Sequence, residues 1–354
     1  MIDYKIYNSG TVYDIDLELP PEERWNSVID ATGDEIYELH ETITKLKEEL
    51  LSSLILPPAL SAILTAGSGW LMRCYSSMVW PEHYDEIKGM ADYTKLDPND
   101  LFFANVLYDL YSIGNACSAC SSYSFNLRGR QPCLARNVDW DEPNTIGHHT
   151  VMLKFHRKGK SYYAVGILGL VGVLSAMLPH QWAITMNMAP PAWEYSGVLG
   201  RTPALHHIRH VCDQFGAFGN VVNRLQEYRT VSPFFAHVVG VKPQQHKVVT
   251  SYGSEYDVRV AKDNFLVQTN HYVDVSEEIE QHNPPAETDE EGFYYDTYER
   301  YDAIHRRFKK HRPTSMKTAL NPLRRHPVTS DATMQTMVFC PATSKYHLEV
   351  REPK

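Results

Sequence analysis

The 354-residue sequence predicts an α+β protein with two parts, a mostly helical segment over residues 1–119 and a sheet-rich domain over residues 120–354. After residue 120, two blocks of mainly antiparallel strand candidates are separated by helices, which suits two stacked sheets with helices outside. Hydrophobic residues make up 43% of the chain and charged residues 22%, so a chain of this length can bury a large core.

Helices are predicted at three places in the first part. Pro20 and Pro21 end an extended strand and open the first helix, with acidic residues in its first turn. The second helix is expected over residues 34–52, because apolar residues recur there at helical spacing: Ile36, Leu39, Ile43, Leu46 and Leu50. A third helix begins at residues 97–98 and runs to about Leu110.

Strands dominate the second part. The first block is predicted at residues 120–126, 132–138, 150–156, 161–168, 171–176 and 182–188. Two or three helices follow between about residues 203 and 229. The second block is expected at residues 235–241, 246–252, 257–261 and 265–269, and a helix near 291–310 precedes closing strands near 333–340 and 345–350.

The charge distribution excludes a general nucleic-acid-binding protein. The formal net charge is −9 and no basic stripe occurs. One segment is locally basic, but Asp213 and Glu227 interrupt it, so a solvated helix face is expected there. Its basic residues are His206, His207, Arg209, His210, Arg224 and Arg229. Residues 2–5 are not an apolar leader and the chain has no Asn-x-Ser/Thr sequon, which predicts a cytoplasmic protein. A lysosomal or secreted protein would need a leader that has been removed.

An apolar stretch lies within residues 50–80. It contains two prolines and is bracketed by charged and polar residues, so it is too short and too broken to span a bilayer. A buried helix pair is one interpretation. The other is a partly exposed apolar surface that makes transient membrane contact or admits an acyl chain.

The six cysteines do not form a dense disulfide framework. Cys117 and Cys120 have C-x-x-C spacing, but a zinc ribbon needs a second pair and a thioredoxin-like motif would open a helix. No spaced set of metal ligands and no glycine-rich phosphate loop stands out. We therefore predict no metal and no organic cofactor.

One cysteine and two charged residues stand at a spacing that predicts a reactive site. Arg136 follows Cys120 by 16 residues and Asp139 follows it by 19. A hairpin that begins at Cys120 and turns at residues 127–130 would bring both side chains back beside the thiol. A thiol attacks only as the thiolate, which a neighbouring cation favours. Cys120 is therefore the predicted nucleophile.

Several motifs carry a family resemblance. Residues 120–122 and 136–139, CSS and RNVD, resemble a C-T-S motif followed at the same offsets by R-N-x-D. Residues 17–25, LELPPEERW, resemble an L-x-L-P-P-x-x-R-W segment, and residues 268–272 resemble a T-N-containing segment. The chain thus resembles the N-terminal-nucleophile (Ntn) hydrolases of the cholylglycine hydrolase superfamily, in the branch of acid ceramidase and N-acylethanolamine-hydrolysing acid amidase.

The resemblance implies an αββα sandwich and a cysteine amidase that hydrolyses N-acyl lipids, N-acylethanolamines or ceramides, through a thioester at an acid pH optimum. It implies a zymogen that cuts itself between Ala119 and Cys120 into a heterodimer of residues 1–119 and 120–354. The freed α-amine, whose reference pKa is about 7.7–8.0, would act as the general base.

The resemblance also assigns roles to five further residues. Asp139 would hold the new α-amine and Arg136 would lie against the thiol. Asn270 would donate its side-chain amide to the developing oxyanion. Asn187 resembles a strand-end asparagine of the family, and Arg300 resembles its late arginine.

Alternatives stay open at this point. Cys117 is a rival nucleophile, but its offsets of 19 to Arg136 and 22 to Asp139 fit the family pattern less well. The same site could transfer an acyl group to another amine, or hydrolyse conjugated bile salts or penicillin-type amides. The chain could also be a non-catalytic lipid-binding homologue that has kept the fold without the activity.

Overall fold

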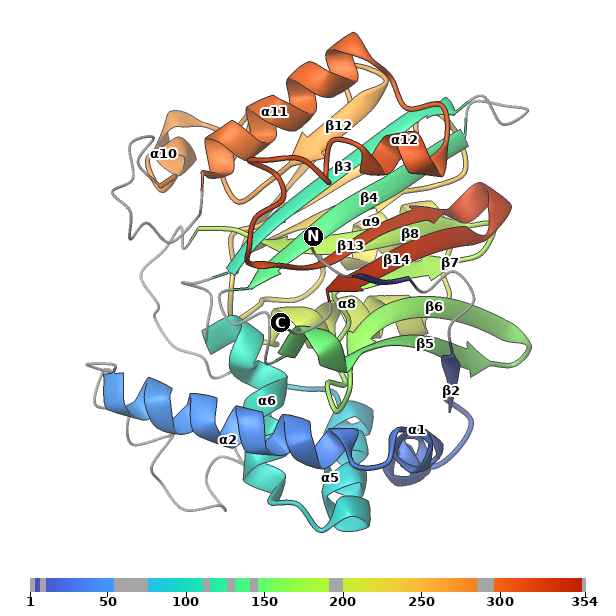
Figure 1. The fold of residues 1–354 in the computed structure, drawn as a ribbon, viewed down its shortest axis with the longest axis vertical. Coiled ribbons are helices and arrows are strands. Elements are labelled where there is room, and N and C mark those ends of the chain that lie inside the picture. The colour runs from blue at the N-terminus through green and yellow to red at the C-terminus, as the bar shows by residue number, and fades with distance from the viewer. Residues whose placement is uncertain are drawn as a thin grey trace.

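The computed structural model shows two stacked sheets with helices on their outer faces (Figure 1). The structure describes residues 4–6, 11–53, 76–110, 115–125, 131–140, 146–190, 200–284 and 296–351. Most of the predicted apolar stretch, residues 54–75, lies outside this part. Among the described residues, none of the helices is both long and apolar enough to cross a bilayer.

One sheet has six strands and is antiparallel at every pairing. In spatial order the strands are β1 (Tyr4–Ile6), β14 (Lys345–Arg351), β13 (Thr333–Cys340), β4 (Gln131–Trp140), β3 (Asn115–Phe125) and β12 (Phe265–Gln268). The predicted strand that opens at residue 120 therefore begins five residues earlier, at Asn115. Residue 120 lies in the middle of β3 and not at its start.

The second sheet has eight strands. In spatial order they are β11 (Tyr256–Val260), β10 (His246–Ser251), β9 (Phe234–Val239), β8 (Trp182–Met188), β7 (Ser175–Leu178), β6 (Lys160–Ile167), β5 (Thr150–Arg157) and β2 (Val12–Asp16). All pairings are antiparallel except the parallel one between β2 and β5. The strand predicted over residues 171–176 is found at β7, four residues later at its start.

The six-stranded sheet is covered on its outer face by α11 (Thr297–Lys310) and α12 (Met316–Leu320), with α10 (Glu277–Glu280) beside them (Figure 1). Ile304 and Phe308 of α11 and Leu320 of α12 pack with Ala135 and Val338 of the sheet. Between the sheets lies a separate apolar layer: Leu134, Met152, Val165, Met177, Ala183, Val239, Met337, Phe339, Leu348 and Val350. This order of layers is the predicted αββα sandwich.

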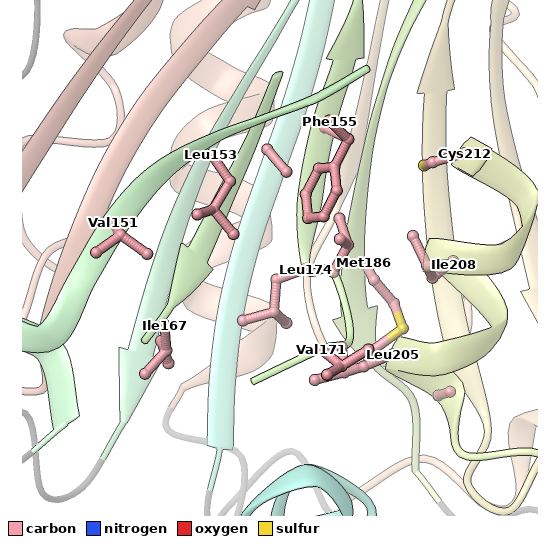
Figure 2. Close-up of a cluster of buried hydrophobic side chains, with 14 of the residues drawn as sticks. Val151, Leu153, Phe155, Ile167, Val171, Leu174, Met186, Leu205, Ile208 and Cys212 are labelled. Atoms are coloured by element: carbon pink, nitrogen blue, oxygen red, sulfur yellow. The ribbon is translucent and has the colours of Figure 1, made fainter. Parts of the chain in front are cut away.

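The eight-stranded sheet is covered by α8 (Ala204–Asp213) and α9 (Phe218–Arg224). Figure 2 shows Leu205, Ile208 and Cys212 of α8 facing Phe155 and Met186 of the sheet. The predicted solvated basic face over residues 206–229 is wrong for three of its six basic residues, because His206, His207 and Arg209 are fully buried. The guanidinium of Arg209 is neutralised by Glu86 at 3.0 Å and Asp213 at 2.9 Å.

The N-terminal helices pack at the lower end of the sandwich (Figure 1). They are the short η1 (Pro21–Glu23), α1 (Asn26–Thr32), α2 (Glu35–Ser53), α5 (Pro81–Thr94) and α6 (Pro98–Leu110). The apolar stripe predicted for the second helix is confirmed in α2, where Ile36, Leu39, Ile43 and Leu46 are buried. Two short 3₁₀ turns, η2 (Gly147–His149) and η3 (Pro341–Thr343), complete the described elements.

Candidate active site

Strands β3 and β4 position the candidate site through their register. Near the turn Phe125 pairs with Gln131, and this register continued along the hairpin would place Cys120 opposite Arg136. The register shifts between Ser122 and Phe125, so that Arg136 pairs with Ala119 instead. Side chains alternate between faces, and a one-residue shift therefore moves Cys120 to the face opposite Arg136.

Cys117 shares a face with Arg136 and lies against it. Arg136 Nη2 donates to Cys117 Sγ at 3.0 Å. The backbone N–H of Cys117 donates to Asn270 Oδ1 at 2.8 Å. The thiol and the backbone nitrogen of one cysteine are thus each held by a residue that the sequence singles out.

Arg136 is itself fixed by the neighbouring sheet. It is fully buried, and its Nη1 donates to the carbonyl oxygen of Leu174 at 3.0 Å and to Ser175 Oγ at 2.9 Å. These contacts orient the guanidinium so that Nη2 points at sulfur. A buried cation at this distance can stabilise negative charge that develops on the sulfur during a reaction.

Arg300 of α11 holds the cysteine from the other side. Its Nη1 donates to the Cys117 carbonyl oxygen and to Ser118 Oγ, both at 2.8 Å. Its Nη2 donates to Asn270 Oδ1 at 3.0 Å. Burial lowers the pKa of Arg300, while the nearby Asp139 carboxylate opposes that shift.

Asp139 lies on β4, near the guanidinium of Arg300. On the neighbouring strand β3 it is next to the peptide bond between Ala116 and Cys117. In the β3–β4 register Asp139 pairs with Ala116. Thr333 Oγ1 donates to its Oδ1 at 2.6 Å. Burial raises the pKa of Asp139 to about 6, although Arg300 and the hydrogen bond from Thr333 act in the opposite direction. The carboxyl can therefore gain or lose a proton near neutral pH.

The two asparagines meet at the ends of β8 and β12. Asn270 Nδ2 donates to the carbonyl oxygen of Met188 at 3.0 Å. Asn187 Nδ2 donates to the carbonyl oxygen of Gln268 at 3.0 Å and to that of Thr269 at 3.3 Å. Asn187 thereby fixes the backbone just before Asn270, and its own buried Oδ1 has no hydrogen-bond partner.

Cys120 lies on the opposite face of the six-stranded sheet. It packs beneath α11 with Cys133, Ala135 and Ile304. Burial raises the pKa of its thiol well above the ordinary value for cysteine. Arg136, which the sequence places against the Cys120 thiol, contacts Cys117 instead.

A narrow apolar cavity of about 20 Å³ adjoins the site. Leu174, whose carbonyl holds Arg136, and Trp140, which follows Asp139, both line it. Figure 2 shows Leu174 near Val171 and Leu205. The remaining wall is equally apolar: Leu39, Ile43, Ala104, Leu107, Ile146, Ile167 and Leu170. A cavity of this volume holds about one water molecule, so a larger ligand would enter only if the apolar wall moved apart.

The structure thus gathers Arg136, Asn270 and Arg300 around Cys117, with Asp139 and Asn187 immediately beside them. Sequence reasoning missed the supports of these residues: Leu174, Ser175, Met188, Thr297 and Thr333. Three of these supports are hydroxyl residues with no motif of their own. Only the tertiary pairing identifies them.

The αββα sandwich is that of the Ntn hydrolase fold, and it holds a buried cysteine with an arginine on its sulfur and an asparagine on its backbone nitrogen. A solved structure described as a Caenorhabditis elegans N-acylethanolamine-hydrolyzing acid amidase (NAAA) ortholog superposes with a TM-score of 0.51 and 20% identity. The superposition covers 64% of this chain and 93% of that one.

Sequence comparisons point the same way. The family model for the beta subunit of N-acylethanolamine-hydrolyzing acid amidase matches residues 11–66. The N-acylethanolamine-hydrolyzing acid amidase of Caenorhabditis elegans is 24% identical over 273 residues, which is 73% of each chain. Acid ceramidase of Mus musculus is 23% identical and covers 73% of this chain and 68% of its own length. The chain is thus similar in sequence to N-acylethanolamine-hydrolyzing acid amidase and acid ceramidase, and similar in fold to the former.

Proposed function

We propose that the protein is a self-processing cysteine amidase that hydrolyses the amide bond of N-acyl lipids and that Cys117 is its nucleophile. The observation that carries the assignment is the 3.0 Å contact between Arg136 Nη2 and Cys117 Sγ. The Cys117 backbone nitrogen, bound to Asn270, is the atom that processing would convert into an α-amine. One residue then supplies both nucleophile and base.

Processing begins with attack of Cys117 Sγ on the carbonyl carbon of Ala116. The acyl group moves from the Cys117 nitrogen to sulfur, and that nitrogen gains the thiol proton. Water then hydrolyses the thioester, which leaves the Ala116 carboxylate, a free thiol and a new N-terminus at Cys117. Asp139, paired with Ala116, lies beside the bond that is cut. We assign Asp139 and Asn270 to holding the new amine.

The same two groups would then cleave the substrate. Sulfur attacks the amide carbon, the Cys117 amine takes the thiol proton and passes it to the departing nitrogen, and the product amine leaves. The Cys117 amine next removes a proton from a water molecule. That water attacks the thioester carbon and releases the fatty acid. Asn270 Oδ1 orients the Cys117 nitrogen in this scheme, because Asn270 Nδ2 is bound to Met188.

The relatives suggest the substrate class, and the apolar wall of the cavity beside Arg136 is compatible with it. The cavity wall is entirely apolar, and its Leu174 is joined to Arg136 by a 3.0 Å hydrogen bond. An acyl chain that entered by moving this wall apart would gain about 25 cal/mol per Å² of apolar surface removed from water. The names of the relatives specify an N-acylethanolamine and ceramide as substrates. An N-acylethanolamine or a ceramide is therefore the expected substrate.

The cleaved fragments would stay together as a heterodimer. Buried Glu86 of α5 accepts hydrogen bonds from Arg24 at 2.9 Å and from Arg209 of α8 at 3.0 Å. Arg24 and Glu86 belong to the first fragment, and Arg209 belongs to the second. Separating them would leave buried charges unpaired, which is strongly unfavourable.

Intact-mass analysis of the purified protein tests both the cleavage and the nucleophile. We expect fragments that meet between Ala116 and Cys117. Cys117→Ala should give one uncut, inactive chain, whereas the matched Cys120→Ala should still cleave and turn over an N-acyl lipid. Fragments that meet between Ala119 and Cys120, or loss of cleavage only in Cys120→Ala, would overturn the assignment to Cys117. Activity of an uncut chain would overturn the processing step.

A further inference from the structure

We propose that Glu38, His148 and His149 form a binding site for a divalent transition-metal ion. Each side chain offers one ligand atom, and these atoms all lie within 4.8 Å of one another. Glu38 comes from α2, and both histidines come from η2, 110 residues later in the chain. The proposal does not rest on the amidase function.

His149 supplies the second, independent observation. Its side chain is 1% exposed, and neither of its ring nitrogens has a hydrogen-bond partner. His148 Nδ1 is also buried without a partner. Buried polar atoms are nearly always hydrogen-bonded, so an imidazole with two orphaned nitrogens requires an explanation. A metal ion bound by one nitrogen of each ring and by Glu38 would give His149 a partner at one of its two nitrogens.

The histidines are held on rigid backbone. A Cβ added at Gly147 would lie 2.8 Å from Met334 Cβ, so η2 packs directly on β13. The carbonyl oxygen of His149 accepts from the backbone N–H of Leu168 at 3.0 Å. The two rings lie close together, with centroids 4.0 Å apart. Such support fixes ligand positions, which a metal site needs.

The donor set selects the class of metal. Two imidazoles and one carboxylate suit Zn²⁺, Co²⁺ or Ni²⁺, whereas Ca²⁺ and Mg²⁺ prefer an all-oxygen shell. Three protein ligands leave a coordination position for water. Glu38 is exposed, and this provides an entry path for the ion.

The position of the site gives it a structural consequence. It joins α2 to the sheet domain, across the two fragments that the proposed cleavage produces. Leu39 and Ile146, the neighbours of Glu38 and of η2, line the apolar cavity. A bound metal would therefore tie α2 over that cavity and stabilise the folded protein by mass action.

The test uses the full chain, first freed of metal with a chelator. Co²⁺ is titrated while the visible ligand-field absorption is recorded, and the melting temperature is measured with and without Zn²⁺. We expect saturable binding with a rise in melting temperature. Glu38→Gln and His148→Ala should each weaken binding by at least about tenfold and abolish the rise. Exposed controls Glu48→Gln and His311→Ala should bind like wild type.

His149→Ala opens a buried position, so His148→Ala and Glu38→Gln carry the decision if it fails to fold. Absence of binding, or equal binding in these two variants and the two controls, would overturn the proposal and assign any bound ion to other histidines. The readouts are spectroscopic and thermal, so they are independent of whether the protein proves to be an amidase.

Discussion

Replacing Arg136 by glutamine removes the cation that faces Cys117. The guanidinium lies 3.0 Å from Sγ in a fully buried position, where water cannot take its place. A hydrogen bond to a charged group contributes about 1.5–3 kcal/mol. If that energy is realised when sulfur becomes the attacking anion, the reaction should slow by about 10- to 150-fold. The loss should affect self-cleavage and substrate hydrolysis alike, because both begin with the same sulfur.

The assay is a time course of self-cleavage by intact mass, together with steady-state hydrolysis of an N-acyl lipid. In Arg136→Gln we expect kcat and kcat/KM to fall in parallel, the signature of an interaction made in the transition state. Arg136→Lys should fall less, since it keeps the charge but loses the planar fork. Ser175→Ala removes only one support of the guanidinium and should lose least.

A folded Arg136→Gln protein that cleaves and turns over at the wild-type rate would refute this reasoning. Circular dichroism and the melting temperature separate that outcome from misfolding. Glutamine leaves the Leu174 carbonyl oxygen without its partner, so some loss of stability is expected. If Arg136→Gln fails to fold, the other two variants decide. A faster rate for Ser175→Ala than for Arg136→Lys would support the reasoning, and the reverse order would contradict it.

Two further predictions concern pH and acyl length. Burial lowers the pKa of His207 and of His246 to about 4, below the value of about 6.5 for an unfolded histidine. The unfolded chain thus takes up these protons first, so stability is complete above about pH 6.5 and falls by about 1.4 kcal/mol per histidine per pH unit towards pH 4. Urea midpoints at pH 7 and pH 5 test this, and equal midpoints would contradict it. Ala104→Leu narrows the apolar cavity, so kcat/KM should fall for substrates with long acyl chains and stay unchanged for those with short ones. An equal fall for both would show that the cavity does not bind the acyl chain.

Much of the fold could be predicted because local periodicity and long-range packing agree. The apolar stripe predicted for residues 34–52 is the buried face of α2. The strand predicted over residues 182–188 is β8, with the same bounds. Such segments can be predicted without knowing which elements they pack against, because every position in them favours the same secondary structure.

The charge pattern gave a wrong prediction of exposure where the ion-pair partner of a basic residue was distant in sequence. Arg209 belongs to a segment whose charge pattern predicts a solvated basic face, yet the residue is fully buried. Its partner Glu86 lies 123 residues earlier, on a helix of the N-terminal segment. A buried arginine cannot be distinguished from an exposed one by neighbours in the sequence when the compensating carboxylate comes from another layer of the fold.

The choice between the two cysteines depended on a single irregularity in a hairpin. Offsets in sequence predict which residues are close along two strands, but the face that each side chain occupies depends on register. The register near the turn pairs Cys120 with Arg136 by extension, whereas the shift between Ser122 and Phe125 pairs Ala119 with Arg136 and turns Cys117 towards the guanidinium. A bulge has no reliable signature in one sequence, because it reflects how both strands fit their sheet. Deleting one residue between Ser122 and Phe125 should remove the irregularity and leave Ala119 opposite Arg136, so Cys117 should keep its face and cleavage before Cys117 should persist.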